Sequence, residues 1–87
     1  MNPFLEKAVE HLEVALLEKA NFVPALLSLC EYNLEKNNFG KVNELLQKAS
    51  FIEKNDPVIL FLKAKLHLSK SELAKANDFI LQAIAIN

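Results

Sequence analysis

The chain has 87 residues, of which 52% are hydrophobic and 24% are charged, with one glycine and three prolines. This composition is typical of one ordered, helix-rich domain and excludes a disordered or collagen-like chain. The formal net charge is −1 and arginine is absent, which argues against a surface that gathers nucleic acid, anionic lipid or phosphate.

The first predicted helix begins at Pro3 or Phe4, because Asn2 can cap it and proline suits the first turn. Its apolar residues recur at helical spacing and form one stripe, which consists of Leu5, Ala8, Val9, Leu12, Ala15 and Leu16. Pro24 then fits the first turn of a second helix. The apolar residues of this second helix are Leu26, Leu27, Leu29, Cys30 and Leu34.

Three further helices follow. The stretch EKNNFG predicts a turn, because asparagine and glycine tolerate left-handed backbone conformations, and a third helix is expected from about Lys41 to about Ile52. Asp56 can cap and Pro57 can open a fourth helix that runs through Leu68. The stretch SKSEL ends it, and a fifth helix continues to the chain end. No alternation of period two indicates a strand, so the predicted fold class is all-α with five helices.

The sequence matches itself when it is shifted so that Leu26 falls on Leu60. Other pairs aligned by this shift include Leu34 with Leu68, Lys41 with Lys75, Asn43 with Asn77, Ala49 with Ala83, and Ile52 with Ile86. The same shift places Lys7, Ala8, Leu12 and Ala15 under Lys41, Val42, Leu46 and Ala49. The first helix is therefore a further copy of the third and fifth.

This shift corresponds to a period of roughly 34 residues, and the period and pattern resemble the tetratricopeptide repeat family over nearly the whole chain. The resemblance implies a solenoid, a right-handed superhelix of antiparallel helix pairs. Residues 2–20 would form the second helix of a partial repeat, and 23–56 and 57–87 would form two full repeats. Small residues stand where the helices of a unit cross in the family, and these are Cys30, Ala64, Ala8, Val42, Ala76, Ala15, Ala49 and Ala83. Lys63, Asn33 and His67 depart from the pattern, and other helical-hairpin solenoids are the alternative.

The last helix is apolar on nearly every side, and no polar capping helix follows it. A helix of this kind is expected to be buried on nearly every side. The chain is therefore expected to be a segment of a longer array or to self-associate as a homo-oligomer. The face proposed for this contact consists of Phe79, Leu81, Ile84 and Ile86.

In the tetratricopeptide family, the first helix of each unit lines a concave groove that holds an extended peptide or a helix. The resemblance implies a groove here lined by Pro24, Leu27, Ser28, Glu31, Leu34 and Glu35 and by Val58, Phe61, Leu62, Lys65, Leu68 and Ser69. This surface is mostly apolar. Some family members hold a C-terminal carboxylate with lysine, asparagine and arginine at several of these sites, where this sequence has Leu27, Glu31, Val58 and Leu62. The expected partner is an apolar or amphipathic protein segment, oriented by Glu31 and Lys65. The alternative is that neighbouring parts of the same parent protein fill the groove.

The sequence gives no sign of catalysis, a metal or a cofactor. His11 and His67 are predicted to lie apart on different helices, and Cys30 is expected to be a packed thiol. The lone glycine, Gly40, excludes a glycine-rich phosphate loop. With one cysteine and no membrane-spanning run, a cytoplasmic location is the default expectation, although it is undetermined if the chain is a fragment.

The leading hypothesis is therefore a non-catalytic protein-interaction scaffold, with no nucleic-acid or membrane partner. One alternative is a structural or oligomerisation segment of a larger protein, which the apolar last helix favours. Another is an RNA-binding helical repeat, which would need a basic groove with base-reading polar residues that Leu27, Phe61 and Leu62 do not provide.

Overall fold

The computed structural model describes residues 3–86, and within this range it contains five α-helices and no strand. The helices are α1 (Pro3–Glu18), α2 (Val23–Glu35), α3 (Phe39–Ile52), α4 (Pro57–Ser69) and α5 (Leu73–Ile86). The predicted all-α fold is confirmed. The third helix begins at Phe39, slightly before its predicted start at Lys41, and the predicted Asn2 cap lies outside the described residues.

Proline starts α2 and α4 where the sequence indicated, and a capping aspartate also precedes α4. The carboxylate of Asp56 accepts a hydrogen bond of 2.9 Å from the backbone amide of Val58, which satisfies one of the free amides of the first turn of α4. Pro57 occupies that first turn, and Pro24 does the same in α2. The residue before α2 is Phe22, whose side chain forms no capping hydrogen bond. Pro24 alone therefore favours the start of α2.

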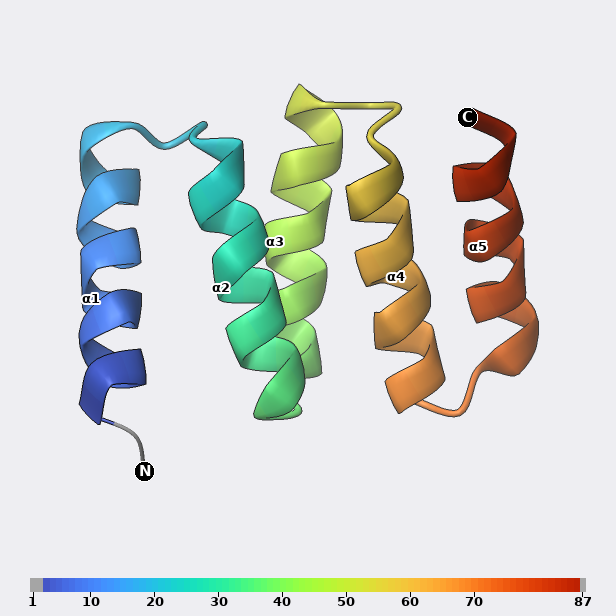
Figure 1. Ribbon diagram of the computed structural model, residues 1–87, viewed down its shortest axis with the longest axis horizontal. Coiled ribbons are helices and arrows are strands. Elements are labelled where there is room, and N and C mark those ends of the chain that lie inside the picture. Colours follow the sequence, from blue (N-terminus) through green and yellow to red (C-terminus); the bar gives the residue numbers. More distant parts are fainter. Residues whose placement is uncertain (1–2, 87) are drawn as a thin grey trace.

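The helices lie side by side in chain order (Figure 1). Each helix contacts the next one along the chain, and α2 also contacts α4. Consecutive helices run in opposite directions, with α1 and α5 at the two ends of the row. The row is therefore open, and α2 and α4 lie next to each other on one of its faces.

The core lies between α2, α3 and α4. Its fully buried residues are Leu26, Leu29, Cys30, Val42, Leu45, Leu46, Ala49, Ile59, Leu62 and Leu66. In contrast, none of residues 4–18 of α1 is fully buried, although Val9, Leu12 and Leu16 pack partly against this core. Ala76 and Ala83 of α5 are 1% and 0% exposed, since their small side chains let α4 and α5 approach closely.

The repetition of the sequence is also present in the geometry. One and the same shift along the chain carries both ends of α2 onto those of α4 and both ends of α3 onto those of α5. The two intervening turns use equivalent backbone bonds, because the amides of Asn38 and Glu72 donate to the carbonyls of Asn33 and His67. Asn37 and Ser71, which the same shift aligns, both have a left-handed backbone, with φ of 59° and 61°. The two helix pairs are thus copies of one structural unit.

Candidate functional site: a groove between α2 and α4

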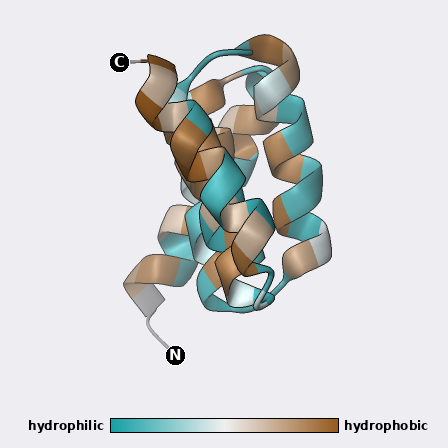
Figure 2. Ribbon diagram, turned by 90° about the vertical axis from the view of Figure 1, so that its right-hand side faces the viewer, coloured by the Kyte–Doolittle hydropathy of each residue, from teal (hydrophilic) through white to brown (hydrophobic). Residues whose placement is uncertain are grey.

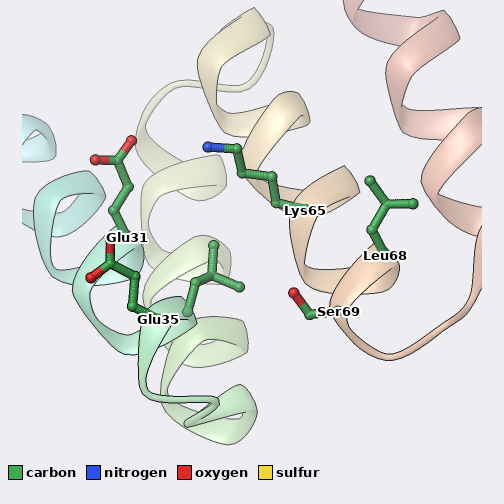
Figure 3. Close-up of a pocket in the computed structure, with 6 residues that line it drawn as sticks. Glu31, Glu35, Lys65, Leu68 and Ser69 are labelled. Atoms are coloured by element: carbon green, nitrogen blue, oxygen red, sulfur yellow. The ribbon is translucent and has the colours of Figure 1, made fainter.

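A groove of about 410 Å³ lies between α2 and α4 at their C-terminal ends (Figure 3). Six residues line it, namely Glu31, Leu34, Glu35, Lys65, Leu68 and Ser69. They form three pairs that the repeat aligns, so each unit contributes the same three positions. The groove exists because α2 and α4 are first helices of consecutive units and contact each other directly.

Charges of opposite sign stand on the two walls of this groove. Glu31 and Glu35 project from α2, and Lys65 projects from α4 on the other side (Figure 3). All three side chains are exposed, and none of them takes part in the ion pairs found among residues 3–86. Leu34 is half-buried and Leu68 is 47% exposed, so the lining of the groove also offers apolar surface. The groove can therefore bury an apolar side chain and pair with charges beside it.

Six of the twelve predicted groove residues line this cavity, namely Glu31, Leu34, Glu35, Lys65, Leu68 and Ser69. The positions Pro24, Leu27, Val58 and Phe61 lie nearer the N-terminal ends of α2 and α4 and are not among the residues lining this cavity. Val58 and Phe61 are 50% and 45% exposed, Pro24 is exposed and Leu27 is half-buried. They extend the surface of the same two helices beyond the cavity.

The placement of Leu62 in the groove is wrong. Leu62 is 2% exposed and belongs to the core cluster with residues of α2 and α3. Its equivalent in the preceding unit, Ser28, is exposed. The difference arises because α4 has α2 beside it, whereas no first helix precedes α2 among the described residues. Leu62 therefore joins the two units and is not available to a partner.

The predicted face on the last helix is exposed in part. Leu81, Ile84 and Ile86 are 55%, 59% and 43% exposed. Phe79, in contrast, is half-buried, and its ring stacks on the His67 ring of α4 with centroids 5.3 Å apart. Phe79 thus packs between α4 and α5 and does not belong to an outer face.

A side-chain hydrogen bond spans each of the two turns within the units, and neither bond was predicted from the sequence. In the first unit the side-chain amide of Asn38 donates to the Asn33 side chain at 3.1 Å. At the equivalent positions in the second unit, His67 Nδ1 lies 3.1 Å from Glu72 Oε1. The sequence repeat could have indicated these bonds, because it aligns Asn33 with His67 and Asn38 with Glu72, and both pairs can form a hydrogen bond.

Glu72 is the centre of a small charged cluster. His67 hydrogen-bonds its carboxylate, and Lys75 and Lys70 lie 3.2 and 3.3 Å from its oxygens. These contacts lower the pKa of Glu72 from 4.5 to about 2, and the hydrogen bond from His67 contributes most to this shift. The cluster holds the α4–α5 turn together and forms no part of the groove.

Cys30 has the environment of a structural thiol. It is 0% exposed, and burial, reinforced by the negative charge of Glu31, raises its pKa from 9.0 to about 12. A thiol that stays protonated is a poor nucleophile. Among residues 3–86, no three histidine, cysteine or acidic side chains are grouped so that they could hold a metal ion. No helix in this range is both long and apolar enough to cross a bilayer.

Comparison with protein-family models, with curated proteins and with solved structures gives no match.

Proposed function

We propose that the chain is a non-catalytic protein-interaction module of the tetratricopeptide type. In this proposal the helix pairs continue as a right-handed superhelix, and the groove between α2 and α4 is its concave binding surface. Three features support it: the repeated spacing of the helix bounds, the equivalent left-handed turns, and the direct contact between the first helices of consecutive units.

The proposed ligand is an apolar or amphipathic segment of a partner protein. The single observation that carries this proposal is the groove itself, whose lining combines exposed leucine surface with charges that make no ion pair within residues 3–86. A partner side chain that covers Leu68 gains about 25 cal/mol for each Å² of apolar surface removed from water. Glu31 and Glu35 select a basic residue near α2, and Lys65 selects an acidic residue near α4.

The carboxylates of the groove also disfavour RNA as the ligand. Nucleic-acid affinity depends on neutralising phosphates with lysine and arginine. Two of the three charged residues in the groove are acidic. A phosphate chain would therefore meet a net negative wall on α2.

The test is a selection of helical peptides from a displayed library on the purified chain, repeated with groove variants. We expect the wild type to enrich peptides with an apolar anchor between a basic and an acidic residue. Glu31→Lys and Glu35→Lys together with Lys65→Glu reverse the groove charges and should enrich peptides with the reversed order. Leu68→Asp should abolish the enrichment. Leu17→Asp is the matched control, because Leu17 is 86% exposed on α1, away from the groove.

The proposal fails if the charge-reversed variant enriches the same peptides as the wild type, or if Leu68→Asp has no effect. Circular dichroism of each variant verifies that the helices are intact. Filter binding of single-stranded RNA at low salt tests the alternative function, an RNA-binding helical repeat. The proposal predicts that the chain retains no RNA on the filter.

A further inference from the structure

The surface that α2 and α4 share continues beyond the groove toward the N-terminal ends of both helices. On α2 it consists of Pro24, Leu27, Glu31 and Leu34, and the repeat-equivalent residues on α4 are Val58, Phe61, Lys65 and Leu68. Each set recurs at spacings of three, four and three positions, which places its members on one side of the helix. All of these side chains are exposed or half-buried, and only Glu31 and Lys65 among them are charged.

The charges of this surface are confined to one end of it. Glu31, Glu35 and Lys65 line the groove at the C-terminal ends of the two helices, whereas the residues of both sets toward the N-terminal ends are uncharged. The exposed end of the row differs, because α5, nearest the viewer in Figure 2, is largely apolar and carries only Lys75 and Asp78 as charged residues. A ligand on the surface of α2 and α4 therefore meets a charged end and an apolar end, which can fix its direction.

The helix termini make the charged end more negative. Consecutive helices alternate in direction, so α2 and α4 run the same way and both place their C-terminal ends at the groove (Figure 1). The C-terminal end of a helix carries a partial negative charge, and the N-terminal end carries a partial positive charge. Lys36 and Lys70, which follow the two helices, line no part of the groove and contact the Tyr32 ring and the Glu72 carboxylate. The N-terminus of a ligand helix is therefore favoured at this end.

The two walls of the groove also distinguish the order of charges along a ligand helix. Seen from the open side of the groove, with the N-terminal ends of α2 and α4 upward, α2 lies on the left and α4 on the right (Figure 3). Consecutive residues of a right-handed helix lie about 100° apart. On a ligand helix that runs upward, a glutamate followed directly by a lysine can place the glutamate near Lys65 and the lysine near Glu31. A ligand helix that runs downward needs the reverse order.

We propose that the ligand of the groove is an amphipathic helix of a partner protein that runs antiparallel to α2 and α4. Near its N-terminus this helix carries a glutamate followed directly by a lysine. The lysine pairs with Glu31 and Glu35, and the glutamate pairs with Lys65. Apolar residues in its next two turns cover Leu27 and Phe61. This inference rests on the proposed function and specifies the ligand of the same site.

Two designed peptides of identical composition test the direction. Both are acetylated and amidated helices with the same apolar residues on one face, and they differ only in the order of the charged pair near the N-terminus. The glutamate-first peptide has the glutamate before the lysine, and the lysine-first peptide has the reverse. Isothermal titration calorimetry measures the Kd of each peptide for the full chain. A nitroxide on the peptide N-terminus reports the direction, because it broadens the NMR signals of nearby backbone amides.

We expect the glutamate-first peptide to bind about threefold to tenfold more tightly, since only its order matches the exposed charges of both walls in the antiparallel direction. The nitroxide should broaden amides at the C-terminal ends of α2 and α4 and leave those at the N-terminal ends sharp. The variant that combines Glu31→Lys, Glu35→Lys and Lys65→Glu should invert the preference between the two peptides. Leu17→Asp on α1 is the control and should change neither affinity.

Three results would overturn the inference and leave the proposed function in place. They are equal or tighter binding of the lysine-first peptide, broadening at the N-terminal ends of α2 and α4, and unchanged binding after a central proline breaks the peptide helix. Absence of saturable binding by both peptides would contradict the proposed function as well. A dimer in light scattering that Leu68→Asp dissociates would make a second copy of the chain the occupant and would also overturn the inference.

Discussion

Two adjacent residues of α4, Phe61 and Leu62, have opposite roles in the structure. Leu62 is 2% exposed and links the second unit to the core of the first, whereas Phe61 is 45% exposed on the surface of α4. Replacement of each by alanine therefore separates packing from surface contact at neighbouring positions. The pair of variants also tests whether Leu62 belongs to the core and not to the groove.

The expected magnitudes differ severalfold. Leu62→Ala removes a side chain whose burial is nearly complete and leaves a cavity, a change that typically costs about 2–5 kcal/mol. Small domains have only about 5–15 kcal/mol of total stability, so the loss is a large share of it. Phe61→Ala removes a ring that is already half in water, and we expect a cost of about 1 kcal/mol or less.

Urea denaturation followed by circular dichroism measures both values. With a dependence of roughly 1–3 kcal/mol per molar urea, Leu62→Ala should lower the midpoint by about 1 M or more. Phe61→Ala should shift it by a small fraction of that. The reasoning is refuted if the two variants have the same midpoint, or if Phe61→Ala is the more damaging one.

Three further predictions concern the turns and the buried thiol. Ser71→Gly should raise the free energy of unfolding by a few tenths to about 1 kcal/mol, because Ser71 has a φ of 61°, whereas Ser71→Ala should give no gain in the same urea titration. Glu72→Gln should lower stability at neutral pH. Because folding depresses the pKa of Glu72, its contribution is complete above pH 4.5 and is lost as the pH falls to about 2, so the wild-type and Glu72→Gln melting temperatures should converge over that interval. Convergence at higher pH instead would contradict this assignment. At mildly alkaline pH, Cys30 should react with a thiol reagent only as fast as the protein unfolds, because its side chain is 0% exposed and its pKa is raised to about 12. Rapid labelling of the native chain would disprove its burial.

The sequence predicted the helices well because their signals are local. The start signals act within one turn of the helix that they begin, and they are Pro24 for α2 and Asp56 and Pro57 for α4. The left-handed residue Asn37 likewise acts locally, at the end of α2. The groove positions Glu31 and Lys65 were predicted from the resemblance to the tetratricopeptide family, in which the first helix of each unit lines a groove, and both residues line the cavity between α2 and α4.

The errors concern positions whose burial depends on which helix lies alongside. Leu62 and Ser28 are equivalent in the sequence, yet only Leu62 is buried, because α2 lies beside α4 and no first helix lies before α2 among residues 3–86. Phe79 was assigned to an outer face, but its contact with His67 depends on the crossing of α4 and α5. Such contacts between helices leave no local pattern that a sequence can reveal.

The open row keeps α1 and α5 apart, whereas a closed bundle would bring α1 against α5. The most direct test of this arrangement is the distance between two spin labels, one at Glu10 of α1 and one at Gln82 of α5. The distance is measured by electron paramagnetic resonance in a Cys30→Ala background. The row extends 35 Å along its longest axis with α1 and α5 at its ends, so the labels should lie much farther apart than those on two helices in contact. A separation close to the roughly 8–10 Å between the axes of packed helices would show that α1 contacts α5 and would contradict the account.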